Sequence, residues 1–253
     1  MKLSVIIITL NEESNIRDCL ESVKFADEII VVDAGSSDRT VEIARSYTDR
    51  IFTPGWLGYS AAKEFALARA RGEWILWIDA DERVSEELKR EILEAIDNPG
   101  KIVAFAFPRK SFFLNRWIRH SGWYPDYVIR LFKAGYGRFS SSLVHEGVMV
   151  DGALGRLKNP IVHYTYPTLE KYFQKFNNYT TLAAQDLRMR GEKFSYFKLF
   201  FHPCAKFFKM YIQKLGFLDG VEGFILAVFS AFYVFVKYAK LKYADGFSQP
   251  EKR

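Results

Sequence analysis

A run of apolar residues that ends in a group of carboxylates constrains this chain more than any other feature. The run extends from Trp74 to Ile78 and is followed by Asp79, Asp81 and Glu82. A run this apolar predicts a β-strand buried on both faces, as in parallel sheets. In open α/β folds, ligands bind at the edge formed by the carboxyl ends of such strands. The run therefore predicts an α/β fold with carboxylates at its ligand-binding edge.

The first third of the chain alternates predicted strands with predicted helices. Strands are predicted over residues 3–10, 28–32, 51–52 and 74–78, and helices over residues 14–25, 40–47, 60–71 and 85–96. Strands joined by helices pair in parallel, which predicts a doubly wound sheet. Further strands over residues 103–108, 127–132 and 138–145 predict a mixed or antiparallel region, and residues 168–190 predict a helix.

The last third combines aromatic residues with lysines. On a helical wheel, residues 197–215 form an apolar face, opposite a basic polar face that contains Lys198, His202, Lys206 and Lys209. This arrangement is typical of helices that lie in a membrane interface. Pro203 predicts a helix start or a kink. The members of the apolar face are Phe197, Phe200, Phe201, Cys204, Phe208, Tyr211, Ile212 and Leu215.

A second helix is predicted after residues 216–220, where Asp219 and Glu222 have the spacing of a capping box. Its apolar run, residues 224–236, would span roughly 20 Å, which is short of the roughly 30 Å hydrocarbon core of a bilayer. The run fits a re-entrant, interfacial or buried helix, and no segment predicts a transmembrane helix. The alternative for both C-terminal helices is a plain hairpin packed on the sheet.

Charge and cysteine content limit the class of protein. The formal net charge of +6 fits an anionic partner such as a nucleotide or an acidic lipid surface, and also fits ordinary solubility charge. The two cysteines, Cys19 and Cys204, favour a reducing compartment without a disulfide framework. Asn11 and the two glutamates after it end the first apolar run, which therefore predicts a strand rather than a signal peptide.

Polar residues follow the predicted parallel strands. Asp33, after the second strand, can accept hydrogen bonds from a nucleobase or a ribose, and Gly35 allows the backbone to approach a ligand closely. Asp79 and Asp81 can hold a divalent cation that binds a diphosphate; alternatively, they only start a turn. The sequence contains no Gly-x-Gly-x-x-Gly or Gly-x-x-x-x-Gly-Lys pattern, which argues against dinucleotide and Walker-type sites.

Taken in order, these motifs resemble those of the family 2 glycosyltransferases, which have a GT-A fold. The matching residues are Thr9, Asn11 and Glu13, the run over residues 33–40, and the Asp-x-Asp motif at residues 79–81. Further segments are similar to the branch that contains bacterial lipopolysaccharide core-biosynthesis glycosyltransferases. They are residues 58–63, 123–126, 130–132, 144–146, 163–164 and 216–220, so the resemblance covers essentially the whole chain.

The resemblance implies an inverting hexose transfer from a UDP-sugar, with Mg²⁺ or Mn²⁺ as cofactor. It implies a nucleotide-sugar site that contains Thr9, Asn11, Glu13, Asp33, Gly35, Lys63, Asp79, Asp81 and Arg130. Asp81 is the expected metal ligand, and Asp79 is expected to contact the ribose or a metal-bound water. His163 is a further candidate ligand, or alternatively a hydrogen-bonded core histidine. Arg130 is expected at the diphosphate, or alternatively in a surface ion pair.

Inversion by a single displacement needs a general base that deprotonates the acceptor hydroxyl. Glu146 is the predicted base, because it follows a strand, lies after the Asp-x-Asp motif as the family's catalytic carboxylate does, and has His145 beside it. The alternative is a structural carboxylate paired with an arginine such as Arg138. Asp126 and Glu82 are the reserve candidates.

The resemblance implies a GT-A domain over residues 1–190, with a mixed, mostly parallel sheet flanked by helices. A helical membrane-associating extension is predicted over residues 191–253. The predicted partners are a UDP-sugar donor, a glycolipid or lipopolysaccharide acceptor and the cytoplasmic surface of the cell membrane, with no nucleic acid.

Two other interpretations stay open. A sugar-1-phosphate nucleotidyltransferase shares the sheet architecture, but this chain has Asn11-Glu12-Glu13 where such enzymes have a glycine-rich basic loop. A non-catalytic membrane-associated binding module on the same fold is the other.

Overall fold

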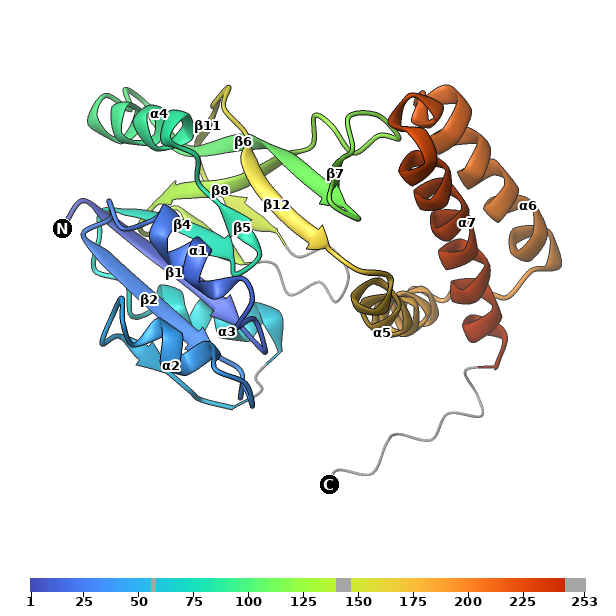
Figure 1. Ribbon diagram of the computed structural model, residues 1–253, viewed down its shortest axis with the longest axis horizontal. Coiled ribbons are helices and arrows are strands. Elements are labelled where there is room, and N and C mark those ends of the chain that lie inside the picture. Colours follow the sequence, from blue (N-terminus) through green and yellow to red (C-terminus); the bar gives the residue numbers. More distant parts are fainter. Residues whose placement is uncertain (56–57, 140–146, 244–253) are drawn as a thin grey trace. The chain divides into compact units, whose positions relative to one another are not determined.

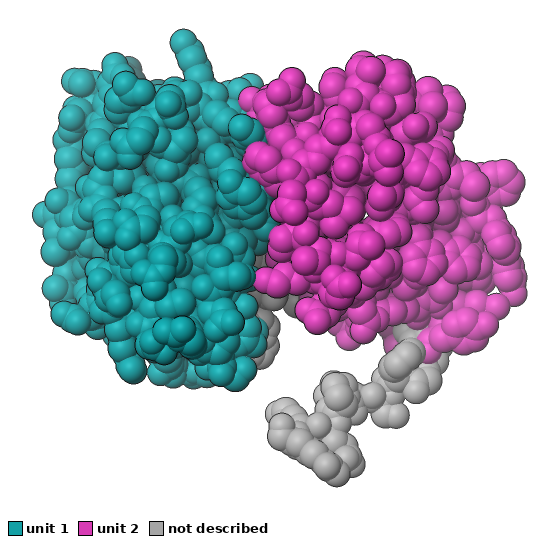
Figure 2. Space-filling view, in the orientation of Figure 1, with its two compact units in different colours: residues 1–110, 125–164 teal, residues 111–124, 165–253 magenta. Residues whose placement is uncertain are grey.

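The computed structural model describes residues 1–55, 58–139 and 147–243 (Figure 1). The chain forms two compact units (Figure 2). Unit 1 contains residues 1–110 and 125–164, and unit 2 contains residues 111–124 and 165–253. This division differs from the predicted boundary at residue 190, because the helix that ends at Met189 and the segment 111–124 belong to unit 2.

Unit 1 is built on a mixed sheet whose described strands follow the order β3-β2-β1-β4-β8-β6-β12-β5. The pairs β3–β2, β2–β1 and β1–β4 are parallel, whereas β4–β8 and β8–β6 are antiparallel. The strands of this sheet in unit 1 are β1 (Leu3–Thr9), β2 (Glu28–Asp33), β3 (Ile51–Phe52), β4 (Trp74–Asp79), β5 (Glu82–Arg83), β6 (Ile102–Phe113), β8 (Tyr127–Lys133), β11 (Ala153–Arg156), which pairs with β6, and β12 (Ile161–Tyr166). A separate two-stranded antiparallel sheet contains β9 (Gly137–Phe139) and β10 (Val148–Val150). The last residues of β6 and β12 belong to unit 2.

Helices cover both faces of the parallel strands (Figure 1). Alternate residues of a strand point to opposite faces, so Val5 and Ile7 pack with α1, α2 and α4, whereas Ile6 packs with α3. Every strand and helix predicted before residue 100 is present, with ends that differ by a few residues. The helices are α1 (Ile16–Ser22), α2 (Thr40–Ala44), α3 (Tyr59–Leu67) and α4 (Glu86–Asp97).

Unit 2 is a helical layer joined to a short hairpin. Its described elements are β7 (Arg116–Trp117), α5 (Leu169–Met189), α6 (Tyr196–Phe208), a π-helical turn (Lys209–Gln213), a 3₁₀ turn (Gly216–Asp219) and α7 (Gly220–Tyr243). Aromatic side chains join α5 to α7; for example, the rings of Phe176 and Phe232 stack with centroids 5.4 Å apart. Pro203 lies inside α6 and not at its start.

The last helix is longer than the apolar run that predicted it. With 24 residues, α7 is about 36 Å long at about 1.5 Å per residue, because the helix continues past Val236 through the lysines to Tyr243. The stretch Gly216–Tyr243 is long and apolar enough to cross a membrane, judged by length and composition alone. The predicted capping box is not formed by Asp219, because its carboxylate binds the segment 119–121 instead.

Candidate active site

The carboxyl ends of the central parallel strands meet at one edge of the sheet. In the strand register, Thr9 of β1 is opposite Asp33 of β2, and Ile8 is opposite Asp79 of β4. The predicted juxtaposition of the two aspartates at one sheet edge is confirmed. Edges of this kind are where open α/β folds bind ligands.

Asp33 organises the turn that follows β2. The side chain is buried, and its carboxylate accepts hydrogen bonds from the backbone N–H groups of Gly35 (2.9 Å) and Ser36 (2.8 Å) and from the Ser36 hydroxyl (2.5 Å). Gly35 has a φ of +102°, which side chains disfavour. Because a carboxylate oxygen can accept more than one hydrogen bond, Asp33 can hold this turn and still accept a bond from a ligand.

The loops after β1 and β2 are tied together by side chain–backbone hydrogen bonds. The N–H of Asn11 donates to the Ser36 hydroxyl (2.8 Å). The N–H of Glu13 donates to the Asp38 carboxylate (3.1 Å), and the Glu13 carboxylate accepts from the N–H of Arg39 (3.1 Å). Asn11 and Glu13, predicted to bind the nucleotide, therefore shape the loops of the sheet edge.

Thr9 carries a buried hydroxyl at the same edge. The residue is 3% exposed, and its Oγ1 has no hydrogen-bond partner within the described ranges. Buried polar atoms are nearly always hydrogen-bonded. The orphaned hydroxyl is consistent with a polar ligand at this edge.

Arg130 of β8 joins two of the three carboxylates at the end of β4 and just after it. Its Nη2 lies 2.8 Å from Oδ2 of Asp79 and 2.5 Å from Oε1 of Glu82. The other Glu82 oxygen accepts a hydrogen bond from the N–H of Asp79 (3.0 Å). The side chain of Glu82 is fully buried, so this reserve candidate presents no oxygen that could act as a base; the Asp79 side chain is 37% exposed.

Trp77 is a site residue that the sequence analysis did not identify. The Arg130 guanidinium carbon lies 3.6 Å from the centroid of its ring, and Nζ of Lys63 lies 4.4 Å from it. Both cations are buried, and cation–π attraction fixes their positions. The sequence did contain a pattern that could have identified Trp77. Trp77 and Asp79 are two residues apart on one strand and therefore lie on the same face of the sheet.

Neighbouring charges control the ionisation of Asp79. Burial acts to raise its pKa, but the attraction of Arg130 and Lys63 outweighs burial and the repulsion of Asp81, so the pKa of Asp79 is lowered. Burial acts to lower the pKa of Arg130, but Glu82 and Asp79 raise it above the usual value for arginine. Asp79 is therefore an anion and Arg130 a cation at neutral pH.

His163 reaches the Asp-x-Asp motif through strand pairing. It lies opposite Glu82 in the antiparallel pair β12–β5, and the N–H of Tyr164 donates to the carbonyl oxygen of Asp81 (2.9 Å). The Nε2 atom of His163 lies 3.4 Å from Oδ1 of Asp81. The structure thus brings together Asp81 and His163, both predicted as metal ligands.

The side chains at this edge could hold a divalent cation whose remaining ligands come from the diphosphate of a substrate. Within the part of the chain that the structure describes, no three His, Cys, Asp or Glu side chains converge as a preformed metal cage. Mg²⁺ is usually held by one or two carboxylates together with substrate phosphates and water, and Mn²⁺ prefers similar oxygen ligands. Asp81 and Asp79 can supply the carboxylates, with His163 beside Asp81.

The predicted general base is Glu146. Glu146 and its neighbour His145 lie outside the described residues, so their roles stay predictions. Asp126, the other reserve candidate, forms an ion pair with Arg109 (2.5 Å) and is 42% exposed.

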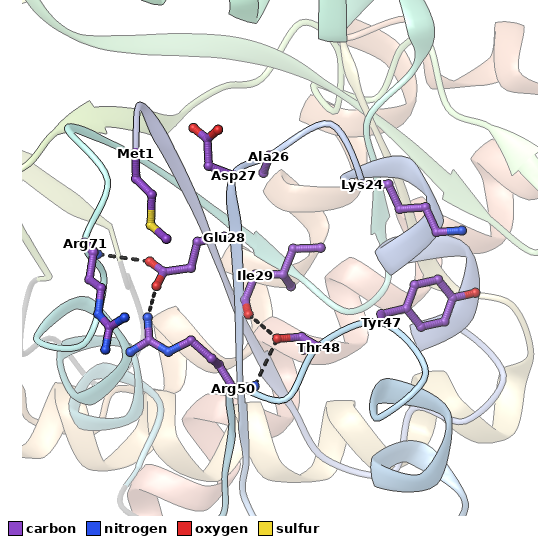
Figure 3. A pocket seen from close by; sticks show the side chains of 10 residues that line it. All are labelled: Met1, Lys24, Ala26, Asp27, Glu28, Ile29, Tyr47, Thr48, Arg50 and Arg71. Atoms are coloured by element: carbon purple, nitrogen blue, oxygen red, sulfur yellow. Dashed lines mark hydrogen bonds and ion pairs between the residues drawn. The ribbon is translucent and has the colours of Figure 1, made fainter.

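A surface cavity of about 290 Å³ lies at the opposite edge of the sheet (Figure 3). Its lining includes Glu28, whose carboxylate accepts hydrogen bonds from the Ser4 hydroxyl (2.5 Å) and the N–H of Arg71 (3.0 Å) and pairs with Arg50. Glu28 begins β2, whereas Asp33 ends it. The cavity is therefore separated from the carboxylate edge by the length of a strand, and it is not the predicted site.

The fold has a counterpart among solved structures. A crystal structure of S. aureus TarS, residues 1–349, is similar with a TM-score of 0.50 over 99% of this chain and 93% of that chain, at 16% identity. A likeness at this identity shows the fold alone. The mixed sheet with flanking helices and a carboxylate edge is a GT-A fold.

Sequence relatives show the family. Residues 4–142 match the model of glycosyl transferase family 2. The chain is 32% identical to the lipopolysaccharide core biosynthesis glycosyltransferase LpsC of Rhizobium meliloti, over 95% of this chain and 92% of that protein. It is also 32% identical to an uncharacterized glycosyltransferase of Rickettsia typhi, over 95% of this chain and 87% of that protein. The chain belongs to the family 2 glycosyltransferases.

Proposed function

We propose that this chain is an inverting, metal-dependent glycosyltransferase that moves a hexose from a UDP-sugar to a lipid-linked or lipopolysaccharide-core acceptor. It would act at the cytoplasmic face of the cell membrane. The proposal has two parts, a donor half (use of a metal ion and a UDP-sugar) and a membrane half (contact with lipid). The observation that supports the donor half is the group formed by Asp79, Asp81 and His163 at the sheet edge that Asp33 shares. The similarity to LpsC over nearly the whole length of both proteins supports the lipopolysaccharide-core acceptor.

Each donor residue has a proposed role. Asp81 holds Mg²⁺ or Mn²⁺, with His163 beside it, and Asp79 contacts the ribose or a metal-bound water. When bound, the cation would stabilise the negative charge that develops on the leaving diphosphate. Lys63 adds positive charge near Asp79. Thr9, Asn11, Glu13 and the turn of Asp33 and Gly35 hold the nucleoside.

Arg130 has a proposed role that its contacts modify. Its Nη2 is engaged by Asp79 and Glu82, and its side chain is only 3% exposed. The guanidinium therefore acts on the diphosphate chiefly through its charge and by holding Asp79 in place. Glu146 stays the proposed base for the acceptor hydroxyl, since inverting transfer needs one.

A test of the donor half measures Mn²⁺-dependent binding of UDP by calorimetry and UDP release from UDP-hexoses. We expect Asp81→Asn to lower UDP release by about 10²-fold or more, because transition-state charge stabilisation of this kind has that magnitude. The matched control is Asp97→Asn on α4, where the side chain is 58% exposed. An Asp81→Asn enzyme with unchanged, metal-dependent turnover would overturn the assignment.

The membrane half of the proposal rests on apolar side chains that unit 2 leaves exposed. Phe197, Phe200, Phe201 and Phe208 of α6 are each more than half exposed. In α7, a second exposed row contains Val221, Phe224, Val228, Phe232 and Phe235. Large contiguous apolar surfaces on soluble proteins usually mark contact sites.

Lysines among these apolar rows favour an acidic lipid surface as the contact. Lys206 and Lys209 are exposed on the same helical segment, and Lys214 follows them. Each lysine near an anionic leaflet contributes about 1 kcal/mol to the free energy of membrane binding. Because α6 and the turn that follows it carry both apolar and basic side chains, the proposed contact is peripheral, with the helix lying in the interface.

Vesicle flotation tests this half separately. The double change Phe200→Asp and Phe201→Asp should reduce binding to vesicles of phosphatidylglycerol by at least about tenfold, since it removes two exposed rings that would enter the lipid interface and adds negative charge. Met149→Asp in β10 is the control, because Met149 is similarly exposed (52%) on unit 1. Equal binding by wild type and double variant would contradict the membrane contact without affecting the donor half.

A further inference from the structure

Asp219 holds the segment 119–121 through its buried carboxylate. Oδ1 accepts a hydrogen bond from the N–H of Arg119 (3.0 Å), and Oδ2 accepts from the N–H of His120 (2.9 Å). The Ser121 hydroxyl lies 3.4 Å from Oδ2. The Asp219 side chain is 2% exposed, and all of these residues belong to unit 2. We name this arrangement the Asp219 clasp.

Glycines allow the backbone to close around the clasp. A Cβ at Gly216 would lie 2.7 Å from the Ser121 hydroxyl, and a Cβ at Gly223 would lie 2.1 Å from the carbonyl oxygen of Gly216. Gly220 has a φ of +71°. The turn between the two C-terminal helices is therefore shaped to bring one carboxylate against the segment 119–121.

The clasp also orients an imidazole. Nδ1 of His120 lies 3.1 Å from Oδ1 of Asp219. Because a carboxylate accepts, Nδ1 is the donor in this contact, which leaves Nε2 as the acceptor whenever the imidazole is neutral. Nε2 makes no hydrogen bond to any residue that the structure describes, and the side chain is 32% exposed. In metal sites, a carboxylate often fixes the tautomer and orientation of the ligating histidine. Asp219 orients His120 in the same way.

Besides the Asp219 carboxylate, two cationic side chains belong to the segment that carries His120 and to the turn beside it. The Arg119 guanidinium lies over the Trp117 ring, 4.2 Å from its centroid, which restricts its motion. The carbonyl oxygen of Lys214 accepts a bond from the N–H of Ser121 (2.8 Å), so the stem of Lys214 runs beside the segment. Among the residues in the described ranges, neither Arg119 nor Lys214 forms an ion pair with a carboxylate. Two cations without ion-pair partners, on the same segment as an oriented acceptor and on the turn next to it, suit an anionic, hydroxylated ligand.

We propose that His120, Arg119 and Lys214 form a binding site for an anionic sugar, with Nε2 of His120 accepting a bond from a sugar hydroxyl. Arg119 and Lys214 bind its phosphate or carboxylate group. The identification of this sugar as part of the acceptor rests on the proposed function. The binding chemistry itself does not, because it follows from the clasp and the charges around it.

A purely structural clasp is the competing explanation. The two backbone N–H groups already satisfy Asp219, so a structural clasp needs no imidazole. A matched pair of variants separates the two explanations. His120→Asn keeps a donor where Nδ1 lies and removes Nε2, whereas Arg119→Gln removes an exposed charge without touching the clasp.

The test is ¹H–¹⁵N NMR of the imidazoles in the full chain, which contains four histidines. Mannose 6-phosphate should shift the Nε2 signal of His120 saturably, and mannose should do so at least about tenfold more weakly, because it lacks the charged group. The signal of His202, whose Nδ1 lies 3.2 Å from the Tyr238 hydroxyl, should stay in place. Arg119→Gln should weaken the titration about tenfold, and His120→Asn should weaken the binding measured by calorimetry.

Two results would overturn the proposal. One is a His120 signal that neither sugar moves at millimolar concentration. The other is equal affinity of wild type, Arg119→Gln and His120→Asn for mannose 6-phosphate. Failure of the proposed function is recognised separately, as absence of Mn²⁺-dependent UDP binding by the wild type. Lys193→Gln, an exposed charge change elsewhere in unit 2, is the control for general electrostatics.

Discussion

Arg130 and Glu82 form a buried ion pair, with Nη2 and Oε1 2.5 Å apart and side chains that are 3% and 0% exposed. The pair fixes β8 against the residues that follow β4, and Asp79 shares the same guanidinium nitrogen. Breaking such a pair from one side leaves a buried charge without its partner.

Arg130→Met should therefore lower the free energy of unfolding by about 3–5 kcal/mol. Adding Glu82→Gln to Arg130→Met should cost less than the sum of the two single changes, because the unpaired carboxylate is removed. Urea unfolding of the four proteins gives the coupling energy. The comparison is the exposed pair Arg39–Glu42, with side chains 70% and 65% exposed, for which we expect less than about 1 kcal/mol. Strict additivity of the Arg130 and Glu82 changes would contradict the buried pair.

Stability should depend on Asp79 at neutral pH and not in acid. The pKa of Asp79 is lowered in the folded protein, so the unfolded chain takes up its proton first as the pH falls. The stabilisation is fully present above the unfolded pKa of about 3.9 and is lost as the pH falls through the folded pKa. The difference in unfolding free energy between wild type and Asp79→Asn should shrink below about pH 4.

Urea unfolding from pH 7 to pH 3 at constant ionic strength measures that difference. Asp18→Asn is the comparison, because the Asp18 side chain is 73% exposed. A difference between wild type and Asp79→Asn that stays constant over this range would contradict the lowered pKa.

The strand ends were predictable because buried parallel strands have an unmistakable composition. Apolar runs located β1, β2 and β4, and parallel pairing then required Asp33 and Asp79 to share an edge, as the register shows. The roles of the polar residues were not predictable in the same way. The Asp33 carboxylate accepts hydrogen bonds mainly from the turn that follows it, and its position at a strand end does not predict this.

Side-chain contacts such as those of Arg130 and Asp219, which join segments far apart in the sequence, could not be predicted from local sequence patterns. Arg130 binds Glu82 because β8 pairs antiparallel with β4, a pairing that no local pattern encodes. Asp219 has the spacing of a helix cap, yet its carboxylate binds residues about a hundred positions earlier. Local sequence preferences cannot decide between capping the helix and binding the distant segment, because either set of hydrogen bonds satisfies the carboxylate.

The two cysteines should react very differently with thiol reagents. Cys19 is fully buried in α1, and burial raises the pKa of its thiol, although Arg83 acts to lower it; Cys204 is exposed on α6. Only the thiolate reacts, so the native protein should release one equivalent of thionitrobenzoate quickly, and a second only on unfolding. Native Cys204→Ser should show no rapid reaction. Rapid modification of two thiols in the native wild type would contradict the burial of Cys19.

Gly223→Ala should destabilise the protein even though alanine is the better helix former. In an open helix the change would be favourable by about 1 kcal/mol. Here a Cβ at Gly223 would lie 2.1 Å from the carbonyl oxygen of Gly216 and 2.8 Å from Cβ of Asp219, so α7 must move away from the turn. Forced repacking of this kind costs about 1–3 kcal/mol. Thermal unfolding measures the change, with Gly147→Ala as control because a Cβ there meets no atom within 4 Å. A variant as stable as wild type would show that the turn can shift, and the tautomer of His120 measured by NMR would then show whether the Asp219 clasp shifts with it.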